Sequence, residues 1–345
     1  MLSATASTKQ QIHGLEKANC MNPSTILEIK DLVTDIRSVR GNIRPVDTVS
    51  MTLHEGQVVG IVGESGSGKS MMAFSVLQLF PTSAARVLSG SIKLWGKDLV
   101  TLSNSELRSI RGKDIGMIFQ DPASYLNPVL TVGKQLAEQL TTHGLKVDAQ
   151  MRISQLLAMV GLSPEVAARY PHELSGGQCQ RVGIASALAC EPSVIIADEP
   201  TTALDVTIQA QILRLLKQLQ TEYGVALMVI THDFGVVAEI CDYVYVMYAG
   251  QMVEEGPVDA MFDAPQHPYT QALLSGILSL HEPQKITLPI KGSVPDLAKL
   301  PSGCRFHPRC PYSMAKCRAE APPFFERDSN RSACWLHDPE IADPR

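Results

Sequence analysis

Residues 63 to 70 form a glycine-rich octapeptide between a strand pattern and a helix pattern. They read Gly-Glu-Ser-Gly-Ser-Gly-Lys-Ser, which matches the G-x-x-x-x-G-K-S phosphate loop. The apolar run at 58–62 predicts a buried strand, and the apolar spacing across 70–79 predicts a helix that begins where the glycines end. This arrangement places backbone N–H groups around a polyphosphate. The sequence therefore predicts an α/β fold that binds a nucleoside triphosphate.

The residues of this loop have separate predicted roles. Its glycines adopt backbone conformations that a Cβ would obstruct and allow close approach to phosphates. Lys69 is expected to reach the β- and γ-phosphates, and the Ser70 hydroxyl is expected to bind Mg²⁺. The alternative, a glycine turn with a surface lysine, leaves the flanking strand and helix unexplained. The predicted nucleotide-binding set of the loop is Gly63, Glu64, Ser65, Gly66, Ser67, Gly68, Lys69 and Ser70.

Two adjacent carboxylates, Asp198 and Glu199, follow a second apolar run at 194–197. Such neighbours repel each other unless a cation or a proton separates their roles. We assign Asp198 to the Mg²⁺ shell and Glu199 to polarising the attacking water as general base. Alone, the pair would be interpreted as solvated acids at a strand end. The phosphate loop in the same chain favours the catalytic interpretation.

Further motifs follow in a fixed order, and together they resemble the ATP-binding-cassette (ABC) ATPases. Leu-Ser-Gly-Gly-Gln at 174–178 resembles the family's signature motif, and Ala-Leu-Asp at 203–205 resembles its D-loop, which implies that Asp205 lies at the ATP site. Gln120 and His232 each follow a predicted strand. The resemblance implies that Gln120 contacts Mg²⁺ and the attacking water, and that His232 contacts the γ-phosphate.

The signature motif implies a partner subunit. In the family it completes the ATP site of an opposite cassette, so ATP lies between two cassettes. A helix is expected from Gln178 to about Ala189, with its positive end directed at a phosphate. Because this chain contains one cassette, we expect a second homologous ATP-binding subunit, with a heterodimer favoured. The residues implied are Ser175, Gly176, Gly177 and Gln178.

The resemblance also implies the architecture. Residues 26–256 are expected to form the cassette, with a RecA-like core, an antiparallel β subdomain and a helical subdomain inserted at about 121–173. The family usually stacks adenine on an aromatic residue before the phosphate loop, whereas residues 32–37 contain none. We expect Ile36 or a nearby arginine to cover the base, because a guanidinium also stacks on π faces.

Composition narrows the setting of this 345-residue chain. A formal net charge of −5 provides no basic footprint, so nucleic acid is not an expected partner. No apolar run approaches the ~18 to 20 residues that span a bilayer. Residues 1–25 lack the apolar stretch of a secretory signal and are expected to be disordered. We expect a peripheral protein on the cytoplasmic face of the cell (inner) membrane.

Residues 257–345 carry a C-terminal extension that points to a subfamily. Segments at 266–274, 292–295 and 301–311 resemble the extension of oligopeptide, dipeptide and nickel importer ATPases. The resemblance implies a motor subunit that works with two transmembrane permease subunits and, indirectly, an extracytoplasmic substrate-binding protein. Peptide is the favoured cargo, and a nickel chelate is possible. The alternative is a soluble ABC regulator whose extension senses a metal or redox state.

The eight cysteines divide into two groups. Those at 20, 179, 190 and 241 are scattered and are interpreted as inert thiols. The other four lie in the extension, and clustered cytosolic thiols indicate a metal before a disulfide. Four thiolates suit a [4Fe–4S] cluster, as some members of this subfamily carry, while zinc and no metal remain alternatives. The predicted ligands are Cys304, Cys310, Cys317 and Cys334.

Overall fold

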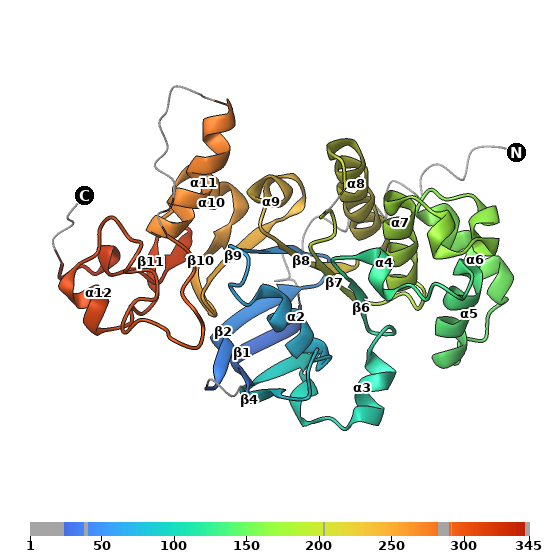
Figure 1. Cartoon of the computed structure of the whole chain (residues 1–345), viewed down its shortest axis with the longest axis horizontal. Helices are drawn as coiled ribbons and strands as arrows, with labels where there is room; N and C mark the ends of the chain where they lie inside the picture. Colours follow the sequence, from blue (N-terminus) through green and yellow to red (C-terminus); the bar gives the residue numbers. More distant parts are fainter. Residues whose placement is uncertain (1–23, 38–40, 203, 282–289, 291, 342–345) are drawn as a thin grey trace, which may run out of the picture.

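The computed structural model describes residues 24–37, 41–202, 204–281, 290 and 292–341, and within them the strands form two sheets (Figure 1). The larger sheet has eight strands in the order β11-β12-β10-β9-β3-β8-β7-β6, and the smaller has four in the order β2-β1-β4-β5. Most of residues 1–25, for which disorder is expected, and Cys20 lie outside the described part.

The centre of the larger sheet is a run of parallel strands. Strand β3 lies between β8 and β9 and is parallel to both, and β8, β7 and β6 continue the parallel order. Their residues are almost all buried, as expected of strands covered on both faces. Parallel order brings the carboxyl ends of these strands to one edge. The bounds are β3 (Val58–Val62), β6 (Ile115–Ile118), β7 (Val194–Asp198), β8 (Ala226–Thr231) and β9 (Tyr243–Tyr248).

The smaller sheet is antiparallel and covers the helix that follows the phosphate loop. Its strands are β1 (Thr25–Ile36), β2 (Ile43–His54), β4 (Ala85–Leu94) and β5 (Lys97–Asp98). Apolar side chains from this sheet, from α2 (Lys69–Leu77) and from β3 and β8 form one buried cluster. The phosphate loop is therefore anchored between two packed layers.

Among the helices of the cassette, α4 to α7 follow β6 and lie together at one end of the molecule (Figure 1). Apolar side chains of α5 and α6 pack against α7. The apolar side chains of Ile153, Leu156, Leu157 and Val160, in and directly after α6, are buried. The helices are α3 (Asn104–Ile110), α4 (Pro122–Tyr125), α5 (Val132–Thr142), α6 (Ala149–Met159), α7 (Gly176–Ala187), α8 (Val206–Tyr223) and α9 (Phe234–Ile240).

The extension adds strands to the larger sheet. Strand β12 pairs with β10, where Glu254 lies opposite Ser332. Tyr248, Tyr269 and Phe306 belong to one buried cluster that joins the extension to the sheet. The extension therefore shares a core with the cassette. Its elements and the adjoining ones are β10 (Gln251–Pro257), α10 (Val258–Asp263), α11 (Pro268–His281), α12 (Ala315–Ala319), β11 (Phe325–Arg327) and β12 (Asn330–Ser332). Of the described helices, none has the length and apolarity needed to cross a membrane.

Candidate active site at four strand ends

Four predicted site segments meet at the carboxyl edge of the parallel strands. The strand order β3-β8-β7-β6 places the phosphate loop, His232, the Asp198–Glu199 pair and Gln120 in that sequence along the edge. Ligands of open α/β sheets bind outside the carboxyl ends of their strands. The sequence motifs, up to about 170 residues apart, are therefore neighbours in space.

The backbone of the phosphate loop requires its glycines. Gly66 and Gly68 have φ values of +81° and +107°, which L side chains rarely adopt. A Cβ on Gly63 would collide with the carbonyl oxygen of Met247. The carbonyl of Ser67 accepts a hydrogen bond of 2.8 Å from the N–H of Gly250. Ser65 and Gly66 are exposed at the loop's tip, and Ser67 is fully buried below it.

Lys69 is buried and bends back over its own loop. Its Nζ donates to the carbonyl of Gly63 at 2.7 Å and to that of Glu64 at 3.0 Å. Burial lowers the pKa of Lys69, while the charges of Glu199, Asp198 and Glu64 raise it. The ammonium therefore lies where an anion would replace two carbonyl partners.

Ser70 and Asp198 are in direct contact. The Ser70 Oγ donates to Asp198 Oδ1 at 3.0 Å. Burial is the main cause that raises the Asp198 pKa, and the neighbouring Glu199 charge raises it further. The Ser70 hydroxyl and the Asp198 carboxylate supply the oxygen ligands that Mg²⁺ prefers. A bound divalent cation would favour the ionised form of Asp198. The residues present therefore fit the predicted magnesium role.

Glu199 joins three side chains around one carboxylate. Its Oε2 accepts from Gln120 Nε2 at 3.0 Å and from the Thr202 Oγ1 at 2.7 Å. His232 Nδ1 lies 3.3 Å from the other oxygen. Glu199 also has a φ of +46°, and its N–H donates to the carbonyl of Ile230 in β8. The structure thus brings together the three residues predicted to be catalytic.

The signature motif lies at the start of α7, and its polar side chains form hydrogen bonds within the motif. Ser175 caps α7, and its side chain accepts from the N–H of Gln178 while Gln178 Oε1 accepts from the N–H of Ser175. Gly176 and Gly177 form the first turn, and a Cβ on Gly177 would press on Ile208 of α8. Asp205 caps α8 by accepting from the Ile208 N–H at 3.0 Å. These residues shape two helix starts.

Two segments of the chain match known families. Residues 46–202 match the ABC transporter family, and residues 253–317 match the oligopeptide/dipeptide transporter C-terminal region. The oligopeptide transport ATP-binding protein AppD of Bacillus subtilis is 47% identical over 326 residues, which cover 93% of this chain and 99% of AppD. The chain belongs to the ATP-binding subunits of ABC transporters. The activity of this ABC subunit is ATP hydrolysis.

Further relatives agree with this assignment. The dipeptide transport ATP-binding protein DppD of Bacillus subtilis is 46% identical over 318 residues, covering 91% of this ABC subunit and 95% of DppD. Among solved structures, the dimeric post-hydrolysis state of the cassette MJ0796 bound to ADP and Pi matches with a TM-score of 0.61 and 31% identity. That match covers 67% of this chain and 98% of the cassette, which confirms the predicted ABC fold.

Sequence reasoning missed one residue of the ABC subunit's site. Thr202 lies in the turn after β7 and donates to the predicted base, Glu199. A hydroxyl residue three positions after a strand-end glutamate was the available signal, but many turns contain threonine. Ile36 is half-buried opposite Ile43, and residues 38–40 beside it lie outside the described part. The adenine contact stays a prediction.

The four extension cysteines share one region without forming a metal site among the described residues. No group of three or more His, Cys, Asp or Glu side chains there is arranged to hold a metal ion. The N–H of Cys304 nevertheless donates to the carbonyl of Cys317 at 2.8 Å, and burial raises the pKa values of Cys310 to about 11 and Cys334 to about 12. The metal prediction is therefore not supported by this arrangement.

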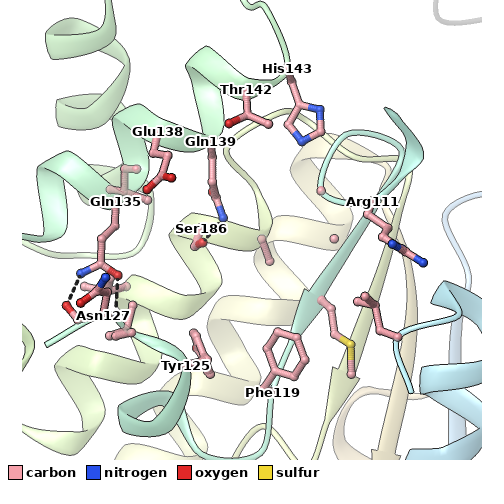
Figure 2. Close-up of a pocket in the computed structure, with 18 of the residues that line it drawn as sticks. Arg111, Phe119, Tyr125, Asn127, Gln135, Glu138, Gln139, Thr142, His143 and Ser186 are labelled. Atoms are coloured by element: carbon pink, nitrogen blue, oxygen red, sulfur yellow. Dashed lines mark hydrogen bonds between the residues drawn. The ribbon is translucent and has the colours of Figure 1, made fainter. Parts of the chain in front are cut away.

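A pocket of about 510 Å³ lies beside the Gln120 segment (Figure 2). It is lined by α5, by α7 and by Phe119, which directly precedes Gln120. Gln139 Nε2 donates to Ser186 Oγ at 2.6 Å across it, and Gln135 exchanges hydrogen bonds with the backbone of Asn127. The lining contains no phosphate-loop residue, so the pocket and the strand-end site are separate.

Proposed function

We propose that this ABC subunit is the ATP-hydrolysing motor of an importer for peptides or related small solutes. The observation that carries the proposal is the order of two family matches in one chain, a cassette followed by an oligopeptide/dipeptide transporter C-terminal region. A relative named a putative peptide import ATP-binding protein, from Brucella abortus, is 49% identical over 302 residues that cover 86% of this chain and 90% of that protein. None of these relatives supports the alternative of a regulator.

The proposed chemistry places each strand-end residue in a role. Lys69 exchanges its two carbonyl partners for phosphate oxygens, and Ser70, Asp198 and Gln120 hold Mg²⁺. Bound Mg²⁺ supplies positive charge that offsets charge developing on the phosphates. Glu199 polarises the attacking water, since Thr202, Gln120 and His232 orient its carboxylate.

The proposed partners follow from the signature motif. The signature motif begins helix α7, whereas this chain's own phosphate loop precedes α2. We therefore assign the phosphate-binding role of this helix start to the ATP of a second ATP-binding subunit, with a heterodimer favoured. The site also includes Gly176, Gly177, Gln178 and the helix-capping Asp205. We divide the chain into a cassette at 26–256 and an extension at 257–345.

The pocket beside Phe119 is the proposed contact with a transmembrane permease subunit. Phe119 lines the pocket, and the adjacent Gln120 donates a hydrogen bond to Glu199. A permease segment that moved Phe119 would therefore also change the position of Gln120 and its contact with the general base. With this contact, we expect the ABC subunit to lie at the cytoplasmic face of the membrane. Cargo selection is left to the permease pair and an extracytoplasmic binding protein.

The direct test is transport by the assembled complex. The chain should co-purify in detergent with two integral membrane proteins and a second ATPase. In proteoliposomes, uptake of a labelled dipeptide should require ATP and be competed by unlabelled peptides. Glu199→Gln in the same complex is the matched control, because it should assemble and bind ATP without transporting. Peptide-independent ATPase activity, with uptake of another solute class, would contradict the peptide assignment.

We also propose the iron–sulfur cluster as a second ligand of this chain. The described side chains are not arranged to hold a metal ion, so the proposal rests on the donor chemistry of the four thiols alone. Burial raises the pKa values of Cys304, Cys310 and Cys334, while hydrogen bonds from the backbone of Phe306, Tyr312 and Leu336 lower them in part. Such bonds favour the thiolate, the form that binds iron. The fourth sulfur, of Cys317, adds to the raised pKa of the other three.

Anaerobic purification tests the cluster. The protein should be brown and contain about four irons per chain. Cys310→Ser should remove the colour, whereas Cys190→Ser, which changes a half-buried thiol outside the extension, should keep it. Colourless protein, with or without one zinc, would refute the cluster and leave the ATPase assignment intact.

A further inference from the structure

The C-terminal extension contacts the phosphate loop directly, at Glu64. The hydroxyl of Tyr269, in the first turn of α11, accepts a hydrogen bond of 2.8 Å from the backbone N–H of Glu64. Tyr269 is fully buried, and its ring packs on Tyr248 and Phe306 with centroids 4.7 and 5.4 Å away. A rigid aromatic cluster therefore holds one backbone group of the loop.

Arg309 holds the side chain of the same residue. Its guanidinium pairs with the Glu64 carboxylate through two bonds, Nη1 to Oε2 at 2.6 Å and Nη2 to Oε1 at 2.9 Å. The Arg309 side chain is 6% exposed and that of Glu64 is 29% exposed. A bidentate, largely desolvated pair is both stronger and more directional than a surface ion pair.

Glu64 is in turn connected to the residue that binds phosphate. Its carbonyl accepts a hydrogen bond from Lys69 Nζ, and its carboxylate charge acts on Lys69. Without Arg309, that carboxylate would be an uncompensated negative charge beside a bound triphosphate. The pair therefore affects both the geometry of the loop and its electrostatic potential.

A second arginine on the same segment supports the other end of the loop. Arg305 forms an ion pair with Asp47 and donates to the carbonyl of Ala249 at 2.6 Å. The next residue, Gly250, donates to the carbonyl of Ser67 in the phosphate loop at 2.8 Å. Both arginines lie between Cys304 and Cys310, so this segment supports the loop directly through Arg309 and indirectly, by way of Ala249 and Gly250, through Arg305.

We propose that the C-terminal extension positions the phosphate loop for ATP, through Arg309 on the Glu64 carboxylate and Tyr269 on the Glu64 backbone. Arg309 and Tyr269 are positioning residues, since they act on ATP through Glu64. The inference rests on ATP binding at the proposed site. Wild-type binding of a non-hydrolysable ATP analogue, and its weakening in Lys69→Ala, are therefore established first, so a failure of that site appears before any extension variant is tested.

A charge cycle in the full-length chain separates positioning from general destabilisation. Arg309→Gln should raise the dissociation constant for the analogue by about tenfold, because it leaves a charged carboxylate unpaired. Glu64→Gln removes the carboxylate charge and keeps the backbone N–H and carbonyl through which residue 64 contacts Tyr269 and Lys69. The double variant should recover most of the affinity, since it carries no unpaired carboxylate. In the assembled complex, Arg309→Gln should raise KM and leave kcat unchanged.

A control and a second variant make the test decisive. Arg331→Gln removes ion pairs with Glu255 and Glu326 elsewhere in the extension and should bind ATP as wild type does. Tyr269→Phe keeps the ring and should weaken binding about threefold by leaving the Glu64 N–H without its acceptor. Equal affinity in Arg309→Gln and Arg331→Gln, or a double variant as weak as Arg309→Gln, would overturn the proposal. If Arg309→Gln does not fold, unchanged affinity in Tyr269→Phe would overturn it.

Discussion

The strand-end cluster and the extension meet at Glu64, but they are held in place by different kinds of contact. Asp198 ends β7, His232 follows β8, and Lys69 begins α2 after the loop that follows β3. The residues of these three strands are almost all buried and hydrogen-bonded to parallel neighbours. The segment from Cys304 to Cys310 has no regular strand and is attached through arginine side chains and an aromatic cluster. Chemistry therefore resides on the rigid sheet, whereas the extension adjusts it through a few polar contacts.

This difference predicts two classes of variant. Changes in the strand-end cluster should remove a chemical step or a nucleotide contact and leave the fold intact, because the buried sheet sets the positions of these residues. Changes in the extension should alter affinity or stability and leave the chemical step intact.

Glu199→Gln is expected to have the largest effect. Loss of the general base should lower kcat for ATP hydrolysis by about 10³-fold, within the range typical of such groups. ATP binding should persist because Lys69 and Ser70 are unchanged, so nucleotide should be trapped in the closed pair. Single-turnover hydrolysis with radiolabelled ATP measures the step. Near-normal turnover would show that another group activates the water.

Ser175→Arg should damage the ATP site whose phosphate loop belongs to the partner subunit. A large charged side chain at the start of α7 would remove a phosphate-contacting group from the partner's ATP, costing about 10²-fold in hydrolysis there. Photocrosslinked nucleotide should still label this chain's own loop. Selective loss of that label would contradict the composite-site arrangement.

Lys69→Ala should weaken ATP binding itself. The ammonium forms charge-assisted bonds of about 1.5 to 3 kcal/mol, so affinity should fall roughly 10- to 100-fold. Equilibrium binding of a non-hydrolysable analogue gives the value. A matched Lys97→Ala change, on the exposed β5 strand, should have no effect, and equal losses in the two variants would argue against a phosphate contact.

His267 in the extension should produce the smallest effect, on stability against pH. Complete burial, with a smaller contribution from the nearby His337, lowers its pKa from an ordinary 6.5 to about 3. Below pH 6.5 the unfolded state binds a proton that the native state does not. The free energy of unfolding therefore decreases as the pH is lowered, by about 2 kcal/mol between pH 6.5 and pH 5.

The His267→Asn variant isolates this contribution. In wild type the Tyr269 N–H donates a hydrogen bond of 3.1 Å to His267 Nδ1, and Asn keeps an acceptor for this N–H. The neighbouring Glu254, whose pKa burial raises, acts in the opposite direction in both proteins. Thermal unfolding at pH 7.5 and 5.0 should therefore show a larger loss in wild type than in the variant. Parallel pH profiles would indicate that His267 is protonated in the folded protein.

Much of the fold was predictable because its signals are local. The apolar run at 58–62 forms strand β3 with those bounds, since a short continuous apolar segment before a glycine loop has few other solutions. Along α8, Ile212, Leu215 and Leu219 recur at helical spacing and are buried, so this face too is encoded locally. The extension was harder to predict, because two of its strands are three residues long and pair with a distant strand of the core.

The sequence by itself determined that this chain binds and hydrolyses a nucleotide, because the phosphate loop and the strand-end acids carry their chemistry within short segments. Only the tertiary structure decided which groups act together. Parallel strand order brought Gln120 and His232 to Glu199, and the shared core brought Arg309 to Glu64 across 245 residues. Such pairs depend on strand order and packing, which no local pattern encodes.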